Sequence, residues 1–245
     1  MKLTVLGCLG AYPYEGQGTT SYLLQSDGFN LLLDAGSSTL VELEKELDPL
    51  DLDAVILTHY HHDHIADLGV LQYYWQLYPT QTPKPILPIY GHTEDTFHFD
   101  DLTMEGVTEG HAYFEAEELK IGPFLVTFMK TIHPVPCYAM RFVEEKTGAV
   151  FVFTGDSGYL ESFNQFAKEA DLFLADTYLF DGNEHHKAHF TAGEAGTFAK
   201  NAAVKKLVLT HLPQHGDLEE LRQQAAATSA GIPVELAQPH KVFTI

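Results

Sequence analysis

The sequence predicts an α/β fold in which two mixed β-sheets lie between outer layers of helices, a four-layer αββα sandwich. Short apolar strands alternate with segments of helical periodicity in both halves of the chain. The strands are joined by hairpin turns as well as by crossover helices, which favours two mixed sheets over one parallel sheet. No shift in composition marks a boundary, so we expect one domain over residues 1–245.

The apolar pattern gives the approximate extent of each element. In the first half, strands are expected at 2–6, 21–25, 29–33 and 54–58, helices at 37–47 and 65–78, and a proline-rich connection at 79–88. Asp27-Gly28 is a hairpin signal, and the run AVILT at 54–58 is typical of a strand buried on both faces. In the second half, strands are expected at 124–131, 138–143, 149–154, 171–175, 205–210 and 242–245, with helices at 160–168, 191–202 and 217–228.

The composition is strongly acidic. The chain has 34 acidic and 14 basic residues, a formal net charge of −20. That charge disfavours a large nucleic-acid substrate, because a polyanion would be repelled. No apolar run approaches the roughly 18 residues of a membrane helix, no signal peptide is recognisable, and Cys8 and Cys137 do not suggest a disulfide framework. We expect a cytoplasmic protein without a membrane partner.

The segment from His59 to His64, His-Tyr-His-His-Asp-His, concentrates metal-binding side chains. In an extended loop His59, His61 and Asp63 would project to one side, because side chains alternate with period two. His64 follows where the chain turns into a helix. Imidazoles and a carboxylate suit divalent ions such as zinc, manganese or iron. Because an apolar strand delivers this segment, a metal site is favoured over a histidine-rich surface loop.

Three later residues stand in the same position relative to predicted strands. His133, Asp156 and His211 each follow an apolar run. A lone histidine after a strand is usually structural, but several strand ends around one cleft are what a binuclear site requires. The candidate metal ligands are therefore His59, His61, Asp63, His64, His133, Asp156 and His211.

These residues resemble the signature of the metallo-β-lactamase superfamily, whose His-x-His-x-Asp-His motif stands here as HYHHDH. The resemblance implies two divalent ions, with Zn²⁺ as first choice and Mn²⁺ or iron as alternatives. It implies that His59, His61 and His133 hold the first ion. Asp63, His64 and His211 would hold the second, and Asp156 would bridge both.

Within the superfamily the chain is most similar to the ribonuclease Z-like branch. The similarity lies in LGCLGAYP followed by LLLDAGSS, in THYHHDHIADLGVL, in DLFLADTYL, and in His189-Phe190-Thr191 ahead of LVLTH. By this resemblance His189 is catalytic and Asp176 orients it, although an exposed loop histidine and a turn-forming aspartate are simpler readings. Thr191 and Glu194 form a capping-box pattern for the helix that follows.

The predicted activity is hydrolysis of a small phosphodiester by a hydroxide that bridges two metal ions, with His189 as proton donor and Asp63 steering the hydroxide. Ribonuclease Z itself is the first alternative. Enzymes of that group carry a protruding arm that grips transfer RNA, and the stretch between His133 and Asp156 is short. A thiolester or lactone hydrolase and, from another class, a di-iron redox or sensor protein are further alternatives. The expected partner is a small-molecule substrate, and the chain is expected to be a monomer or a homodimer.

Overall fold

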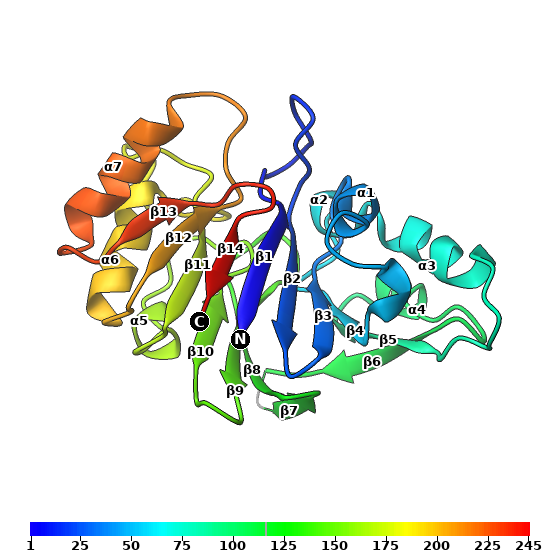
Figure 1. Cartoon of the computed structure of the whole chain (residues 1–245). Coiled ribbons are helices and arrows are strands. Elements are labelled where there is room, and N and C mark those ends of the chain that lie inside the picture. Colours follow the sequence, from blue (N-terminus) through cyan, green and yellow to red (C-terminus); the bar gives the residue numbers. More distant parts are fainter. Residues whose placement is uncertain (116) are drawn as a thin grey trace.

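The computed structural model describes residues 1–115 and 117–245 and contains two seven-stranded sheets that face each other (Figure 1). The first sheet has the order β14 (Val242–Thr244), β1 (Lys2–Gly7), β2 (Ser21–Ser26), β3 (Phe29–Leu33), β4 (Ala54–Ile56), β5 (Leu87–His92), β6 (Thr108–Tyr113). The second has the order β13 (Val234–Leu236), β12 (Leu207–Thr210), β11 (Leu172–Asp176), β10 (Val150–Phe153), β9 (Tyr138–Glu144), β8 (Phe124–Lys130), β7 (Glu118–Ile121). The predicted pair of mixed sheets is confirmed.

Helices cover the outer faces of both sheets. The helices are α1 (Thr39–Leu43), α2 (His62–Ile65), α3 (Leu68–Leu77), α4 (Thr96–Asp100), α5 (Phe163–Phe166), α6 (Ala192–Asn201) and α7 (Leu218–Thr228), with a 3₁₀ turn η1 at Pro49–Asp51. In Figure 1, α5, α6 and α7 lie beside the second sheet, and α1 to α4 lie on the side of the first. No helix among the described residues combines the length and apolar character that crossing a bilayer requires.

The buried positions of β3 and β4 in the first sheet are apolar because both faces of these strands are covered. In β3, Leu31 and Leu33 belong to the cluster between the sheets, while Leu32 belongs to the cluster under α1 and α3. In β4, Ile56 belongs to the cluster between the sheets and Val55 to the cluster under α1 and α3. Each such leucine or isoleucine contributes about 1.5–3 kcal/mol of hydrophobic stabilisation. The alternation fixes the strand register, since a slip of one residue would exchange the two faces.

Most predicted strands lie within a few residues of their expected bounds, and the predicted hairpin is present. Ser26 pairs with Phe29 across the turn. Asp27 and Gly28 between them have φ angles of 49° and 82°. Positive φ at both central residues of a two-residue hairpin loop matches the right-handed twist of the strands it joins.

The sequence analysis missed several strands. β5 begins inside the expected proline-rich connection and contains Pro88, a residue that argues against a central strand. β6 has the polar sequence TEGHAY, while β7 and β13 are short strands at sheet edges. β5, β6 and β13 pair with strands at least fifteen positions away in sequence, and β7 has only four residues, so local apolar periodicity does not reveal these strands.

The helix expected at 65–78 was placed wrongly at its start. The chain is already helical from His62, and α2 is separated from α3 by Ala66 and Asp67. The helix expected at 37–47 is also shorter, because α1 covers only Thr39–Leu43. Its start is capped from outside the segment: Asp67 Oδ2 accepts a hydrogen bond from Leu40 N at 3.0 Å. Similarly, the helix expected at 160–168 is reduced to α5.

Loss of stability in acid should depend on His92, at the end of β5. The side chain is 1% exposed, and burial lowers the pKa of His92 to about 4 despite Glu94 and Asp95. Between pH 6.5 and pH 4 the unfolded chain binds a proton that the folded chain excludes, so stability falls as pH falls. In the metal-free wild type, the free energy of unfolding measured with urea should fall between pH 7.5 and pH 5. His92→Gln should make that fall smaller by about 2 kcal/mol.

The matched control for this experiment is His62→Gln. His62 is exposed, so its replacement should leave the pH profile of the unfolding free energy as in the wild type. Identical pH profiles for His92→Gln and the wild type would contradict the role of His92.

Candidate metal centre

The candidate ligands meet because the strands that precede them end at the same edge of the fold. β3 and β4 are parallel neighbours, as are β10, β11 and β12. The carboxyl ends of parallel strands converge on one edge, where open α/β sheets place their ligands. His59 lies shortly after β4, Asp156 after β10 and His211 directly after β12. Residues up to 152 positions apart in sequence, His59 and His211, are therefore neighbours.

A first group of donor atoms consists of three imidazoles and one carboxylate. His61 Nδ1 lies 3.2 Å from His59 Nε2 and 3.0 Å from His133 Nε2. Asp156 Oδ2 lies 3.7 Å from His59 Nε2 and 3.9 Å from His133 Nε2. In a tetrahedral zinc site with bonds of ~2.1 Å, ligand atoms are about 3.4 Å apart. The spacing of these atoms fits such a site.

A second group of donor atoms shares the Asp156 carboxylate with the first. His64 Nε2 is 3.2 Å from Asp156 Oδ1, and His211 Nε2 is 3.3 Å from Asp156 Oδ2. Asp63 Oδ2 completes the group at 3.1 Å from His211 Nε2. His211 has a φ angle of 52°, a left-handed conformation that costs a non-glycine residue roughly 1–2 kcal/mol. The structure thus brings the residues of each of the two candidate ligand sets together.

Among the buried atoms proposed to face a metal, two make no hydrogen bond within the described residues. They are His64 Nε2 and Asp156 Oδ1. Leaving a buried polar atom unpaired costs about 1–3 kcal/mol, and a divalent ion would satisfy both atoms. The donor atoms of each group also lie within 4.8 Å of one another. The residues therefore fit a pair of divalent cations.

The route by which Asp63 reaches the cluster differs from the predicted one. His61 has an extended backbone, but the chain enters α2 at His62, so Asp63 and His64 project from consecutive positions of a helical turn. Period-two alternation therefore accounts for His59 and His61 only. His62 is exposed and faces away.

Asp34 is a functional candidate that the sequence analysis did not identify. Its side chain is 0% exposed, and its Oδ2 accepts hydrogen bonds from His64 Nδ1 at 2.8 Å and Thr58 Oγ1 at 2.8 Å. Since Thr58 Oγ1 donates to Asp34, it can accept from His59 Nδ1 at 3.1 Å. Asp34 thus holds an imidazole of each group with Nε2 free for a metal. The signal was present in LLLDAGSS, where an aspartate follows an apolar strand.

The remaining imidazole of the first group is oriented by the backbone. His133 Nδ1 donates to the carbonyl oxygen of Ala188 at 3.2 Å, which leaves Nε2 directed at the other ligands. Such outer contacts set the tautomer and orientation of metal-binding histidines. Cys137, by contrast, is a buried free thiol with Sγ 3.5 Å from His59 Nδ1.

Asp176 and His189 form a hydrogen-bonded pair next to the second group. His189 Nδ1 donates to Asp176 Oδ2 at 2.9 Å. Asp176 Oδ1 lies 3.4 Å from His211 Nδ1, and the carboxylate accepts the backbone N–H of Ser157 and of Tyr178. The imidazole of His189 lies parallel to that of His211, with ring centroids 5.1 Å apart. Asp176 therefore does more than form a turn. The expected capping box of Thr191 and Glu194 is also present.

The buried carboxylates make the site attractive to positive charge. Burial opposes protonation of His64, yet Asp156 and Asp34 raise the pKa of His64 to about 10. Burial likewise opposes the charged form of His189, but Asp176 raises the pKa of His189. Burial alone would raise the pKa of Asp63, whereas the hydrogen bond from His211 and the charges of His64 and His211 lower it. In the absence of cations, these carboxylates favour the protonated forms of His64, His189 and His211, whereas burial lowers the pKa values of His59, His61 and His133.

A hollow of about 220 Å³ opens over both groups of donor atoms. Its lining includes His61, Asp63, His133, Asp156 and His211, together with His189. Ala11 also lines it, from the loop after β1, and the backbone N–H of Ala11 donates to Asp63 Oδ2 at 2.7 Å. A substrate in this hollow would reach the candidate ligands and His189 together.

Comparison with known families defines the class of this protein. The sequence pattern described as the metallo-beta-lactamase superfamily matches residues 14–225. The chain belongs to this superfamily, and its fold and its cluster of histidine and aspartate donors are those of a metallo-hydrolase.

Individual relatives place the chain in the ribonuclease Z-like branch. The probable metallo-hydrolase YhfI of Bacillus subtilis is 43% identical over 233 residues, 94% of this chain and 95% of that protein. The crystal structure of YhfI superposes with a TM-score of 0.93 at 41% identity, covering 99% of this chain and 98% of that one. Ribonuclease Z of Streptomyces coelicolor is 27% identical, over 96% of this chain and 94% of the enzyme. Human tRNase Z, short form, has a TM-score of 0.76 at 25% identity, with coverages of 100% and 99%.

Replacing Asp34 should weaken metal binding without removing any proposed ligand. The wild type should bind about two equivalents of Zn²⁺. Asp34→Asn should bind it roughly 10–100-fold more weakly, because His64 and Thr58 lose a shared acceptor. Titration against a chromophoric chelator measures both stoichiometry and affinity. Asp53→Asn is the matched control, since Asp53 accepts a backbone N–H outside the site. Unchanged zinc affinity in Asp34→Asn would refute the role of Asp34.

Proposed function

We propose that this protein is a metal-dependent phosphodiesterase that hydrolyses a small phosphodiester. The observation that carries the proposal is the Asp176–His189 pair, which points a proton-bearing imidazole into the hollow that contains the candidate ligands. The relatives named ribonuclease Z and tRNase Z support phosphodiester chemistry for this branch.

The proposed metal-binding residues supply the environment for the reaction. His59, His61 and His133 would hold one ion, Asp63, His64 and His211 the other, and Asp156 would bridge. Zinc is the proposed metal because nitrogen donors predominate. When bound, two such ions lower the pKa of water and stabilise the charge that develops on the phosphoryl group. The Asp63 carboxylate also accepts a hydrogen bond from the backbone N–H of Ala11, which fixes its orientation. Asp63 is proposed to steer the hydroxide nucleophile.

His189 is proposed to protonate the leaving oxygen. Its Nδ1–H is committed to Asp176, so its other nitrogen carries the transferable proton. The side chain retains 17% exposure and lines the hollow, which places it where a substrate can reach it. A positioned acid of this kind contributes about 10²–10⁴-fold to the rate. Asp176 is a positioning residue, because it acts through His189.

The size of the site and the charge of the chain favour a small substrate. The hollow measures about 220 Å³. Between His133 and Asp156 the chain forms only β9 and β10, joined by a short turn. The formal net charge of −20 opposes the approach of a large polyanion. The second candidate function is processing of transfer RNA, which the names of the ribonuclease relatives favour.

A panel of substrates tests the proposed function. With zinc or manganese bound, the protein should hydrolyse an aryl phosphodiester and a cyclic nucleotide faster than a thiolester, a lactone or a cephalosporin, measured as kcat/KM. A precursor transfer RNA included in the panel should stay uncut. Preferential turnover of the thiolester or lactone would overturn the phosphodiesterase assignment, and efficient cleavage of the RNA would replace it with the second candidate.

His189→Ala should keep both metal equivalents and lose about 10²–10⁴-fold in kcat on a diester with a poor leaving group, because the leaving oxygen is no longer protonated. The loss should be smaller for an aryl diester, whose leaving group needs less help. His185→Ala is the matched control, an exposed histidine of the same loop. An equal loss for both leaving groups would argue against proton donation by His189.

A further inference from the structure

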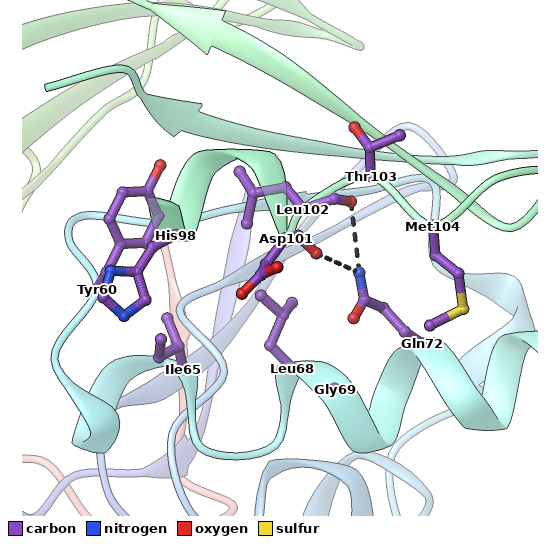
Figure 2. Close-up of a pocket in the computed structure, with 10 residues that line it drawn as sticks. All are labelled: Tyr60, Ile65, Leu68, Gly69, Gln72, His98, Asp101, Leu102, Thr103 and Met104. Atoms are coloured by element: carbon purple, nitrogen blue, oxygen red, sulfur yellow. Dashed lines mark hydrogen bonds between the residues drawn. The ribbon is translucent and has the colours of Figure 1, made fainter. Parts of the chain in front are cut away.

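A second hollow lies behind the loop that carries the first candidate ligands. It has a volume of about 370 Å³ and lies between the segment α2–α3 and the chain that runs from α4 to Met104 (Figure 2). None of the proposed metal ligands lines it. It is larger than the hollow over those ligands and within the range of small-molecule sites. Tyr60, between His59 and His61 in sequence, forms its wall toward the metal centre.

One wall is aromatic and is formed by Tyr60 and His98. The rings of Tyr60 and His98 lie nearly parallel, at 19° and with centroids 5.6 Å apart. Tyr60 is held by its hydroxyl, which donates to the carbonyl oxygen of His92 at 2.7 Å. The other walls carry apolar side chains, among them Ile65, Leu68 and Met104 (Figure 2). A slot with these walls suits a planar ring system.

A buried amide supplies a hydrogen-bond acceptor in this hollow. Gln72 is 6% exposed, and its Nε2 lies within 3.4 Å of the carbonyl oxygens of Asp101 and Leu102 and of Thr108 Oγ1. These acceptors fix the orientation of the amide, so Oε1 points the other way, toward Leu68 and Gly69 (Figure 2). No described residue donates a hydrogen bond to Gln72 Oε1. An acceptor in this position can receive a hydrogen bond from the N–H or O–H group of a ligand.

The charge around the hollow restricts the ligand further. The carboxylate of Asp101 lies between His98 and Leu68 (Figure 2). His98 is already paired, with Nδ1 2.7 Å from Asp95, and neither lysine nor arginine lines the hollow. The amide oxygen of Gln72 and the negative charge of Asp101 disfavour an anionic ligand. They favour a neutral or cationic ligand that donates hydrogen bonds. The phosphate of a substrate therefore does not belong here.

Gly69 keeps the floor of the hollow open. A Cβ atom at Gly69 would meet no heavy atom within 4 Å, so packing does not require glycine at this position. Glycine within a helix costs up to about 1 kcal/mol relative to alanine. Its neighbour Leu68 is buried and Gly69 lines the hollow beside it. A larger side chain at position 69 would occupy the hollow without pushing neighbouring protein atoms aside.

We propose that this hollow is a binding site for a planar heterocycle that carries an amino group and is neutral or positively charged. The ring would pack between the Tyr60–His98 wall and the apolar side chains. The amino group would donate to Gln72 Oε1 and to the Asp101 carboxylate. The site is separate from the metal centre and does not depend on the reaction catalysed there.

Adenine binding to the zinc-loaded protein tests this proposal, with purine, which lacks the amino group, as the matched probe. Titration by ligand-observed NMR should show saturable adenine binding and roughly tenfold weaker purine binding, the effect of losing hydrogen bonds to Gln72 and Asp101. Gly69→Leu should weaken adenine binding at least tenfold, whereas Gly69→Ala should retain it. Both variants should keep the metal content of the wild type and be at least as stable to heat, because alanine and leucine favour a helix over glycine.

Two results would overturn the proposal. One is the absence of saturable adenine binding at millimolar concentration. The other is equal binding by the wild type and Gly69→Leu, which would locate adenine elsewhere, for example at the metal centre. Asp101→Asn provides a variant at an exposed residue, and it should weaken adenine binding more than purine binding.

Discussion

The carboxylate of Asp156 is the contact on which the site depends. It is 2% exposed and lies between two groups of imidazoles that arrive from both sheets. Buried carboxylates and unpaired imidazole nitrogens are costly to keep together without cations. The fold brings them to one edge because its parallel strands end there. Divalent ions would therefore both stabilise this edge and supply the chemistry of a metallo-hydrolase.

Two further aspartates, one at the end of a strand in each sheet, orient the imidazoles around Asp156. Asp34 follows β3 and fixes His64 directly and His59 through Thr58. Asp176 ends β11 and faces both His189 and His211. Because these carboxylates are buried and hydrogen-bonded, the orientation of the donor nitrogens is set by the strands rather than by mobile loops. The proposed acid His189 is held in the same way, by its hydrogen bond to Asp176.

The first metal loop has a different environment on each side. Toward the metal centre, His59 and His61 face carboxylate and imidazole groups. On the other side, Tyr60 borders a larger hollow that is lined by apolar side chains and by the amide of Gln72. The polar centre suits cations and a phosphoryl group, while the second hollow suits a planar amine. One extended stretch of chain presents both surfaces because successive side chains alternate in direction.

The sequence by itself determined the αββα class, most strands, and the candidate ligands, because apolar runs and the spacing of HYHHDH are local signals. Tertiary structure decided what local signals could not. Strands such as β5, with Pro88, form only by pairing with distant neighbours, and α2 begins at His62 so that Asp63 reaches inward from a helical turn. The role of Asp34 required its contact with His64, thirty positions away in sequence. Such contacts arise from the meeting of strand ends, which no local pattern encodes.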